Sequence, residues 1–176
     1  MEEPVPGYHR PAMSTLEATV LPIPVGLQAV GTAGMPFEPV AGSGDLPPGA
    51  LLRVTRGELD VLIAHTARGL VAVDDRCPHM SAPLSVGSLE GCIVSCPLHS
   101  GRFDLASGAT VQFPTTGGLD PDGAYHPTWA PPGGEKRPEP TDLKARARAL
   151  TRVRRLRYYP LRVRDGLIEL ALPRSD

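Results

Sequence analysis

The chain lacks the features that mark several common protein classes. Aromatic side chains make up only 5% of its 176 residues. It has three cysteines, and this low, odd number does not fit a disulfide framework. The formal net charge is −1, whereas nucleic-acid-binding proteins usually carry a strong basic excess. No run reaches the roughly 18 apolar residues of a membrane span, and the acidic start lacks the basic region of a signal peptide. We therefore expect a soluble, cytoplasmic protein without nucleic-acid or membrane partners.

Glycine and proline, in contrast, are abundant. The chain contains 19 glycines and 21 prolines, which helix-rich folds tolerate poorly because both residues disfavour helix interiors. A hydrophobic content of 41% is enough for a core, and the length fits one domain with an appendage. The composition favours an all-β domain with long loops.

The chain divides into an arm, a body and an insertion. Residues 1–35 hold scattered proline and glycine without a period and are expected to form an N-terminal arm. Residues 36–176 form the body, with the chemistry-bearing region at about 74–108. Within the body, residues 114–155 are rich in proline, glycine and charge, and form an insertion too long for an ordinary connection. We expect a short helix at 141–150 and predict that Tyr125 and Trp129 anchor the insertion.

The remaining body is predicted to consist of short strands. Alternating apolar residues between turn signals indicate each strand, and Asp165-Gly166 is a type I′ hairpin signal between the last two. The expected strands are 37–40, 50–56, 59–65, 70–73, 91–95, 102–104, 159–164 and 167–172.

Two short segments carry the chemistry. Cys77-Pro78-His79 and Cys96-Pro97-Leu98-His99 each offer one thiolate and one imidazole. A zinc finger instead places its two cysteines together and its two histidines together along the chain. The mixed order suits two similar loops facing each other across a two-iron cluster, with Cys₂ on one iron and His₂ on the other, as in a Rieske centre.

The surrounding residues suit such loops. Pro78 and Pro97 stiffen the chain directly after each cysteine, and Gly101 and Gly108 allow tight turns beside a bulky cofactor. Metal binding requires deprotonated thiols and neutral imidazoles. Stiff loops would hold these donors in place before the cofactor binds and limit their reorganisation afterwards.

The run from Cys77 to Leu84 and the run from Cys96 to Asp104 resemble the Rieske iron–sulfur family, and most of all its small soluble ferredoxins. The resemblance covers about residues 36–114 and the closing hairpin at about 156–172. It implies an antiparallel β-sandwich with a small cluster-binding subdomain at one tip and one [2Fe–2S] cluster per chain. It also implies that Cys77 and Cys96 ligate one iron, and that His79 and His99 ligate the other through Nδ1 with Nε2 near solvent.

Four positions differ from the family's high-potential branch. That branch has a disulfide between the loops where this chain has Ala82 and Leu98, and hydroxyl donors to sulfur where this chain has Gly101 and Phe103. Loss of charge-assisted donors removes stabilisation of the more negative reduced state. The resemblance therefore implies a low-potential centre.

The leading hypothesis is a one-electron carrier that is not an enzyme by itself. A flavin-dependent reductase would reduce it, and it would reduce an oxygenase or related terminal enzyme, with His79 and His99 as the exit port. One alternative is a Rieske subunit of a larger oxidoreductase, such as a nitrite reductase small subunit. Another is a zinc-stabilised or cluster-sensing binding module. A mononuclear iron enzyme is disfavoured because His9, His65 and His126 are too scattered for a 2-His-1-carboxylate triad.

Two further features have plain interpretations. Cys92 lies in an apolar run and is predicted to be a buried core thiol. A basic stretch is interpreted as a solvated face, with a docking patch for an acidic partner as the alternative; it comprises Lys144, Arg146, Arg148, Arg152, Arg154, Arg155 and Arg157.

Overall fold

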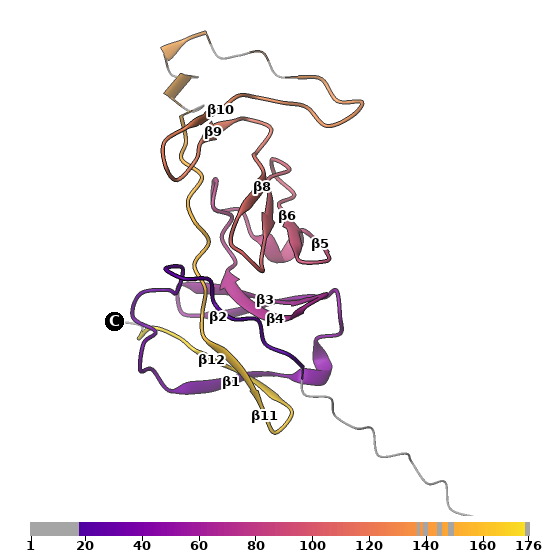
Figure 1. The fold of residues 1–176 in the computed structure, drawn as a ribbon, viewed down its shortest axis with the longest axis vertical. Coiled ribbons are helices and arrows are strands. Elements are labelled where there is room, and N and C mark those ends of the chain that lie inside the picture. Colours follow the sequence, from indigo (N-terminus) through magenta and orange to yellow (C-terminus); the bar gives the residue numbers. More distant parts are fainter. Residues whose placement is uncertain (1–17, 137, 139–140, 144–145, 148–149, 175–176) are drawn as a thin grey trace, which may run out of the picture.

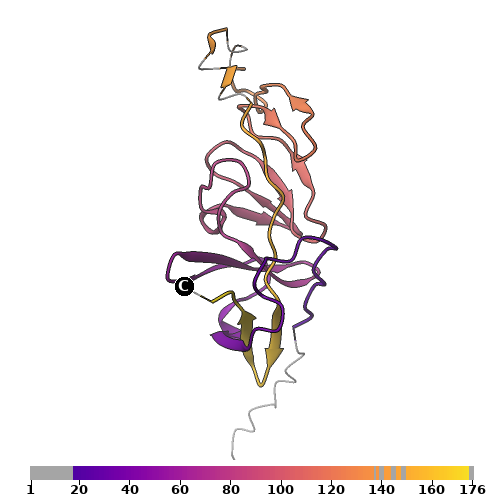
Figure 2. The same ribbon diagram turned by 90° about the vertical axis from the view of Figure 1, so that its left-hand side faces the viewer.

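The computed structural model describes residues 18–136, 138, 141–143, 146–147 and 150–174. These residues build an elongated stack: a β-sheet base, a small four-stranded sheet above it and a lobe at the far end (Figures 1 and 2). The fold is all-β with antiparallel sheets, as the composition predicted. No helix among the described residues has the length and apolar character needed to cross a membrane.

The base consists of two three-stranded sheets. The strands expected at 50–56, 59–65 and 70–73 form a meander, and the expected closing hairpin is confirmed. The structure also pairs this hairpin with the first strand, which the sequence did not predict. The strands are β1 (Phe37–Gly42), β2 (Leu51–Arg56), β3 (Leu59–Thr66), β4 (Gly69–Asp74), β11 (Leu161–Arg164) and β12 (Leu167–Ala171), with a 3-10 turn η1 (Ser43–Asp45) after β1.

Strands β3 and β4 of the meander sheet are buried on both faces. Successive side chains of a strand point to opposite sides. Leu62 and Ala64 of β3 join the core shared with the upper sheet, whereas Val61 and Ile63 join the core shared with β1 and β12. Every residue of β4 is buried. This explains why β3 and β4 are nearly continuous apolar runs. The loops that carry Cys77 and Cys96 lie above this buried sheet.

The closing hairpin has the expected turn. Asp165 and Gly166 have φ values of 50° and 76°, and a type I′ turn requires positive φ at both central positions. Their flanking residues Arg164 and Leu167 are paired directly. The local dipeptide signal therefore determined this turn.

The upper sheet has the order β5-β6-β7-β8. Val94 and Phe103 lie opposite each other on its buried face and pack into the core above the meander. Sequence analysis predicted β6 and β7 but not β5 or β8, which are three residues long. The strands are β5 (Ser88–Glu90), β6 (Ile93–Ser95), β7 (Arg102–Asp104) and β8 (Thr110–Gln112).

The lobe, residues 114–136, contains a two-stranded hairpin that sequence analysis did not assign: β9 (Gly118–Leu119) and β10 (Tyr125–His126). Trp129 attaches the lobe to the body, since its indole N–H donates to the Phe113 carbonyl at 2.7 Å. Tyr125 is 46% exposed, so the anchoring role fits Trp129 better. The helix expected at 141–150 falls partly on residues 144–145 and 148–149, outside the described residues.

The return segment, residues 150–160, runs from the lobe past the upper sheet to the base (Figure 1). Its backbone N–H groups donate hydrogen bonds to successive parts of the molecule. Val153 donates to Leu119 O in the lobe, Arg154 to Pro78 O in the loop after β4, and Tyr158 to Leu27 O in the N-terminal arm. Val153 and Tyr158 are fully buried. This segment links all three tiers.

The described part of the N-terminal arm, residues 18–35, lies along the base. Leu21 N–H donates to Leu70 O and Leu70 N–H donates to Thr19 O, so the arm runs beside β4. Residues 1–17 of the arm lie outside the described residues.

Asp74 joins the return segment to β4. Its carboxylate accepts hydrogen bonds from the Tyr159 hydroxyl at 2.5 Å and from Arg157 Nε at 2.6 Å.

An Asp74→Ala change leaves the buried Tyr159 hydroxyl without this acceptor, and we expect a loss of about 1–3 kcal/mol in the free energy of unfolding. Urea unfolding measures it. Asp122→Ala, which removes an exposed ion pair with Arg155, is the control and should change stability by less than about 1 kcal/mol. Equal losses in the two variants would contradict the prediction.

Candidate metal centre

Two loops above the meander hold the predicted ligands. The first, residues 75–83, leaves the end of β4 and ends at the 3-10 turn η2 (Leu84–Val86). The second, residues 96–101, connects β6 to β7. Each loop therefore begins directly after the last residue of a strand, and that strand sets the position of the cysteine in the loop.

The first loop is closed by its own backbone. Cys77 N–H donates to Ala82 O at 2.7 Å, and Ser81 N–H donates to Cys77 O at 2.9 Å. Ser81 has a φ of 61°, a left-handed conformation that non-glycine residues seldom adopt. These two hydrogen bonds fix Cys77 at the position where the tight loop closes on itself.

The second loop repeats this pattern. Cys96 N–H donates to Gly101 O at 2.8 Å, Ser100 N–H donates to Cys96 O at 3.1 Å, and Ser100 has a φ of 55°. The two loops are thus structural equivalents, as the paired motif predicted. In both loops these bonds join backbone groups of the loop itself.

The four predicted ligands come together as a sulfur pair and a nitrogen pair. The Cys77 and Cys96 side chains are hydrogen-bonded to each other and are buried, at 2% and 4% exposure. The His79 and His99 rings meet edge to face with centroids 4.9 Å apart. Among the described residues, no three His, Cys, Asp or Glu side chains group as ligands of one metal ion. The arrangement is two pairs, which fits the two irons of a [2Fe–2S] cluster.

The two thiols shift each other's pKa in opposite directions. The hydrogen bond to Cys96, and then burial, raises the pKa of Cys77, whereas the same hydrogen bond lowers the pKa of Cys96 to about 6. Backbone N–H groups of His79 and Met80 point at the Cys77 sulfur, and those of Leu98 and His99 point at the Cys96 sulfur. These donors favour thiolates, the form that binds iron.

His79 is held neutral. Burial, and then the charge of His99, lowers the pKa of His79 to about 4. A neutral imidazole has a free lone pair for a metal, so the donor set suits iron at both ends. The residues present therefore fit a Rieske-type group.

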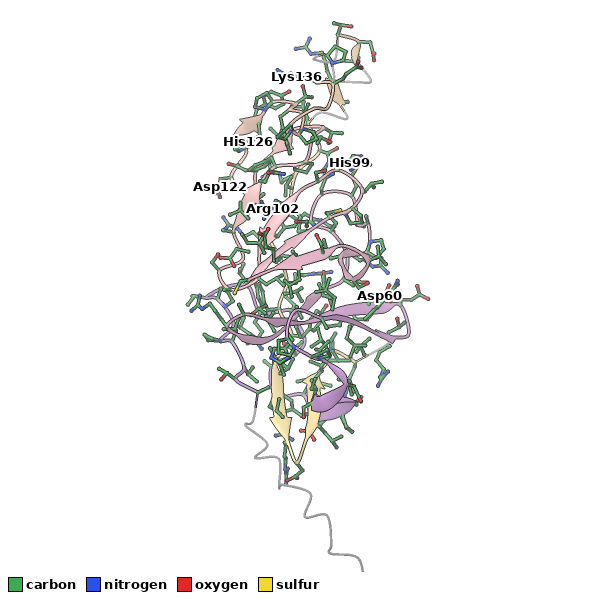
Figure 3. The ribbon with its side chains drawn as sticks, turned by 90° about the vertical axis from the view of Figure 1, so that its right-hand side faces the viewer. Asp60, His99, Arg102, Asp122, His126 and Lys136 are labelled. Carbon is green, nitrogen blue, oxygen red and sulfur yellow. The ribbon has the colours of Figure 1, made fainter. Side chains whose placement is uncertain are left out.

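The two histidines differ in exposure, which corrects the prediction of a shared exit port. His79 is only 6% exposed, and Thr116 of the lobe lies 3.4 Å from its Nε2. His99 is half-buried and stands at the outer edge of the molecule in Figure 3. Leu98, directly before His99, is 58% exposed, as is Met80, directly after His79. The His79 ring is therefore the more covered of the two, with Thr116 of the lobe beside its Nε2.

Asp75 supports the first loop from below and was not singled out from the sequence. It is 1% exposed, and its carboxylate accepts from Ser85 N–H at 2.6 Å and Ser85 Oγ–H at 2.7 Å. Arg53 lies 3.4 Å away. Its position two residues before Cys77 is the only sequence signal for it. Asp75 ties the two ends of the loop together.

The positions without hydroxyl donors are closely packed. Phe103 is 1% exposed, and a Cβ on Gly101 would lie 3.2 Å from its ring. Neither residue has a side-chain hydrogen-bond donor. The donors aimed at the sulfurs in this site are backbone N–H groups, as described for the thiol pair.

The remaining sequence predictions have mixed outcomes. Cys92 is half-buried in the turn before β6, so the prediction of a buried core thiol was wrong. His65 Nδ1 donates to the Leu46 carbonyl oxygen at 2.7 Å, and His126 stacks on Phe113 with ring centroids 3.5 Å apart. His9 lies outside the described residues. Neither His65 nor His126 takes part in the described site.

The basic stretch is more than a solvated face. Arg152 donates to Pro121 O, Arg155 pairs with Asp122, and Arg157 pairs with Asp74. Arg154 reaches the first ligand loop. Lys144 and Arg148 lie outside the described residues. The described arginines from 152 onward therefore fasten the return segment to the lobe, the loop and the base.

An antiparallel β-body with a thiol pair and an imidazole pair on two equivalent loops defines an iron–sulfur protein of the Rieske class. Comparison with known families agrees: residues 37–122 match the Rieske [2Fe-2S] domain. The chain belongs to this family, and a Rieske-type [2Fe–2S] cluster is its cofactor.

Curated relatives are ferredoxins of ring-oxidising systems. The chain is 33% identical to ferredoxin CarAc of Metapseudomonas resinovorans over 78 residues, covering 44% of this chain and 73% of the relative. It is 36% identical to the ferredoxin component of the naphthalene 1,2-dioxygenase system of Pseudomonas aeruginosa over 72 residues, covering 41% and 69%.

Among solved structures, the ferredoxin of carbazole 1,9a-dioxygenase from Nocardioides aromaticivorans IC177 has the same fold. The TM-score is 0.52 at 21% identity, and the alignment covers 78% of this chain and 98% of that protein. The Rieske-type fold predicted from the sequence is confirmed.

Proposed function

We propose that Cys77 and Cys96 bind one iron of the cluster, that His79 and His99 bind the other, and that the chain is a one-electron carrier. The observation that carries the proposal is the separation of two buried, hydrogen-bonded thiols from two contacting imidazoles on equivalent loops. When bound, the cluster supplies a reversible one-electron couple.

The chain's own residues define how an electron is exchanged. The stiff loops keep the ligands in place between oxidation states, and the backbone N–H groups at the two sulfurs stabilise added negative charge. Exchange is expected on the His99 side, where the exposed Leu98 side chain forms a small apolar rim. A small rim of this kind suits the weak, transient contacts of redox partners.

The partners we propose are a flavin-dependent reductase as donor and an oxygenase as acceptor, all in the cytoplasm. Support comes from relatives that are ferredoxin components of dioxygenase systems. It also comes from a solved complex of reduced oxygenase and oxidised ferredoxin in carbazole 1,9a-dioxygenase; its matched chain has a TM-score of 0.51 and 22% identity to this one.

The test is spectroscopic and kinetic. The purified protein should be brown, contain two irons per chain and show an EPR signal after reduction. It should then carry electrons between a purified reductase and oxygenase in a reconstituted assay. A colourless, EPR-silent protein containing zinc would instead identify a zinc-stabilised module and overturn the proposal.

A subunit role in a larger oxidoreductase is the second candidate. The matched region ends at residue 122, while the lobe and the return segment continue beyond it and enlarge the surface beside the loops. Gel filtration of the native protein distinguishes the two: a free carrier elutes alone, whereas a subunit elutes with its complex.

The midpoint potential is expected in the lower part of the Rieske range of about −150 to +300 mV. Gly101 and Phe103 stand where the high-potential branch has hydroxyl donors, so the reduced state is less stabilised. Redox titration followed by EPR measures it, and a midpoint well above zero would contradict the prediction.

A further inference from the structure

The two equivalent ligand loops are held from outside in different ways. The second loop is bound by the segment that follows it: Gln112 Nε2 donates to Ser100 O at 2.7 Å, and Thr115 N–H donates to His99 O at 2.8 Å. These residues lie within the region matched by the family. The first loop is bound by the return segment, which lies outside that region.

Arg154 makes this contact. Its Nε donates to Pro78 O at 3.2 Å, and its Nη2 donates to Cys77 O at 3.3 Å and to Ser81 Oγ at 3.0 Å. Its backbone N–H also donates to Pro78 O at 3.1 Å. One guanidinium thus contacts the carbonyls of a cysteine and the following proline, and the serine in the left-handed conformation that closes the loop.

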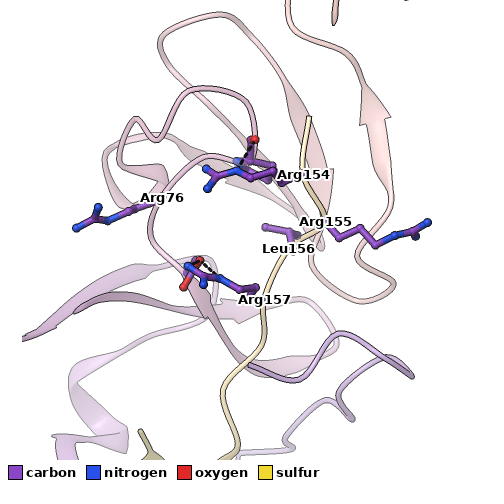
Figure 4. Close-up of a pocket in the computed structure, with 7 residues that line it drawn as sticks. Arg76, Arg154, Arg155, Leu156 and Arg157 are labelled. Atoms are coloured by element: carbon purple, nitrogen blue, oxygen red, sulfur yellow. Dashed lines mark hydrogen bonds and ion pairs between the residues drawn. The ribbon is translucent and has the colours of Figure 1, made fainter. Parts of the chain in front are cut away.

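Neighbouring arginines do not share this role. Figure 4 shows Arg154 directed at the first loop and Arg155 extending away on the other side of the return segment. Arg157 pairs with Asp74 below, and Arg76 extends outward to the Glu58 carbonyl. These arginines and Arg154 line a pocket of about 160 Å³ beside the loop, but the loop carbonyls are contacted by Arg154.

We infer that Arg154 is a positioning residue for the Cys77–His79 half of the centre, and that its charge raises the reduction potential. The planar fork fixes several acceptors at once, which a lysine cannot do. A cation at the Cys77 carbonyl stabilises the reduced cluster, because reduction adds a negative charge nearby. This inference rests on the proposed ligand set, which the Cys96→Ala experiment of the Discussion tests separately.

The experiment compares Arg154→Gln, Arg154→Lys and Arg155→Gln in the full-length, cluster-loaded protein. Arg155→Gln is the matched control, since it removes the same charge from the next residue and leaves the loop contacts in place. Two quantities are measured: the midpoint potential by redox titration, and the rate of iron release to an excess of chelator. Circular dichroism establishes that each variant is folded.

For Arg154→Gln we expect the reduction equilibrium to shift threefold to tenfold toward the oxidised form, tenfold being about 59 mV for one electron, and iron release at least threefold faster. Arg154→Lys keeps the charge but loses the fork, so its potential should stay near wild type while release is faster. Arg155→Gln should change each quantity by less than twofold.

The outcomes are distinguishable from failure of the ligand assignment. A folded Arg154→Gln protein that purifies without iron, beside a loaded Arg155→Gln protein, supports the positioning role. Equal behaviour of Arg154→Gln and Arg155→Gln in both measurements overturns it, even if Cys96→Ala has lost the cluster as expected.

Discussion

A Cys96→Ala protein is expected to contain no cluster. Cys96 is one of two buried thiols at the mouths of the ligand loops, and alanine leaves one iron with a single thiolate. Iron content should fall to background, and the brown colour and the EPR signal should disappear. Because ligand binding is coupled to folding, the variant should also unfold at a lower temperature than the loaded protein.

Cys92→Ala is the control for this experiment. Cys92 is the remaining cysteine, half-buried in the turn before β6, only four residues from Cys96. Its replacement should leave iron content and EPR unchanged. A Cys96→Ala protein that stays brown, with iron equal to that of Cys92→Ala, would contradict the ligand assignment.

A Gly87→Ala change is expected to be among the most destabilising single substitutions. Gly87 has ordinary backbone angles, φ −84° and ψ −155°. Glycine is needed here because neighbouring backbone atoms come too close to leave room for a side chain. A Cβ there would lie 2.1 Å from Ser95 O and 3.0 Å from Leu84 O, both backbone atoms. The strand end that leads into Cys96 must therefore move. We expect a loss of about 3 kcal/mol in the free energy of unfolding, at the upper end for overpacking.

Denaturant unfolding of the two variants Gly87→Ala and Gly44→Ala checks this. Gly44 also has no positive φ, and nothing lies within 4 Å of a Cβ built on it, so its variant should stay within about 0.5 kcal/mol of wild type. Iron release from Gly87→Ala should also be faster, since Ser95 directly precedes Cys96. Equal stabilities of the two variants would show that the tight contact relaxes without cost.

Several elements could be predicted because their signals are local. The meander was visible as apolar runs between glycine turns, and the Asp165-Gly166 dipeptide specified its hairpin. The short strands β5 and β8 were missed, whereas the equally short β6 and β7 were predicted because they flank the Cys96–His99 segment. The pairing of β5 and β8 depends on those neighbouring strands. Cys92 was misplaced because an apolar neighbourhood along the chain does not reveal where a strand starts.

The sequence by itself determined the donor set, the loop equivalence and the β-class, because ligand spacing and strand alternation are properties of adjacent residues. Only the tertiary structure decided that Thr116 covers His79, that His99 remains accessible, and that Arg154 holds the first loop. Those contacts join residues 37 positions apart for Thr116 and His79 and 77 apart for Arg154 and Cys77. No local pattern encodes them, because they arise when the lobe and the return segment fold back over the loops.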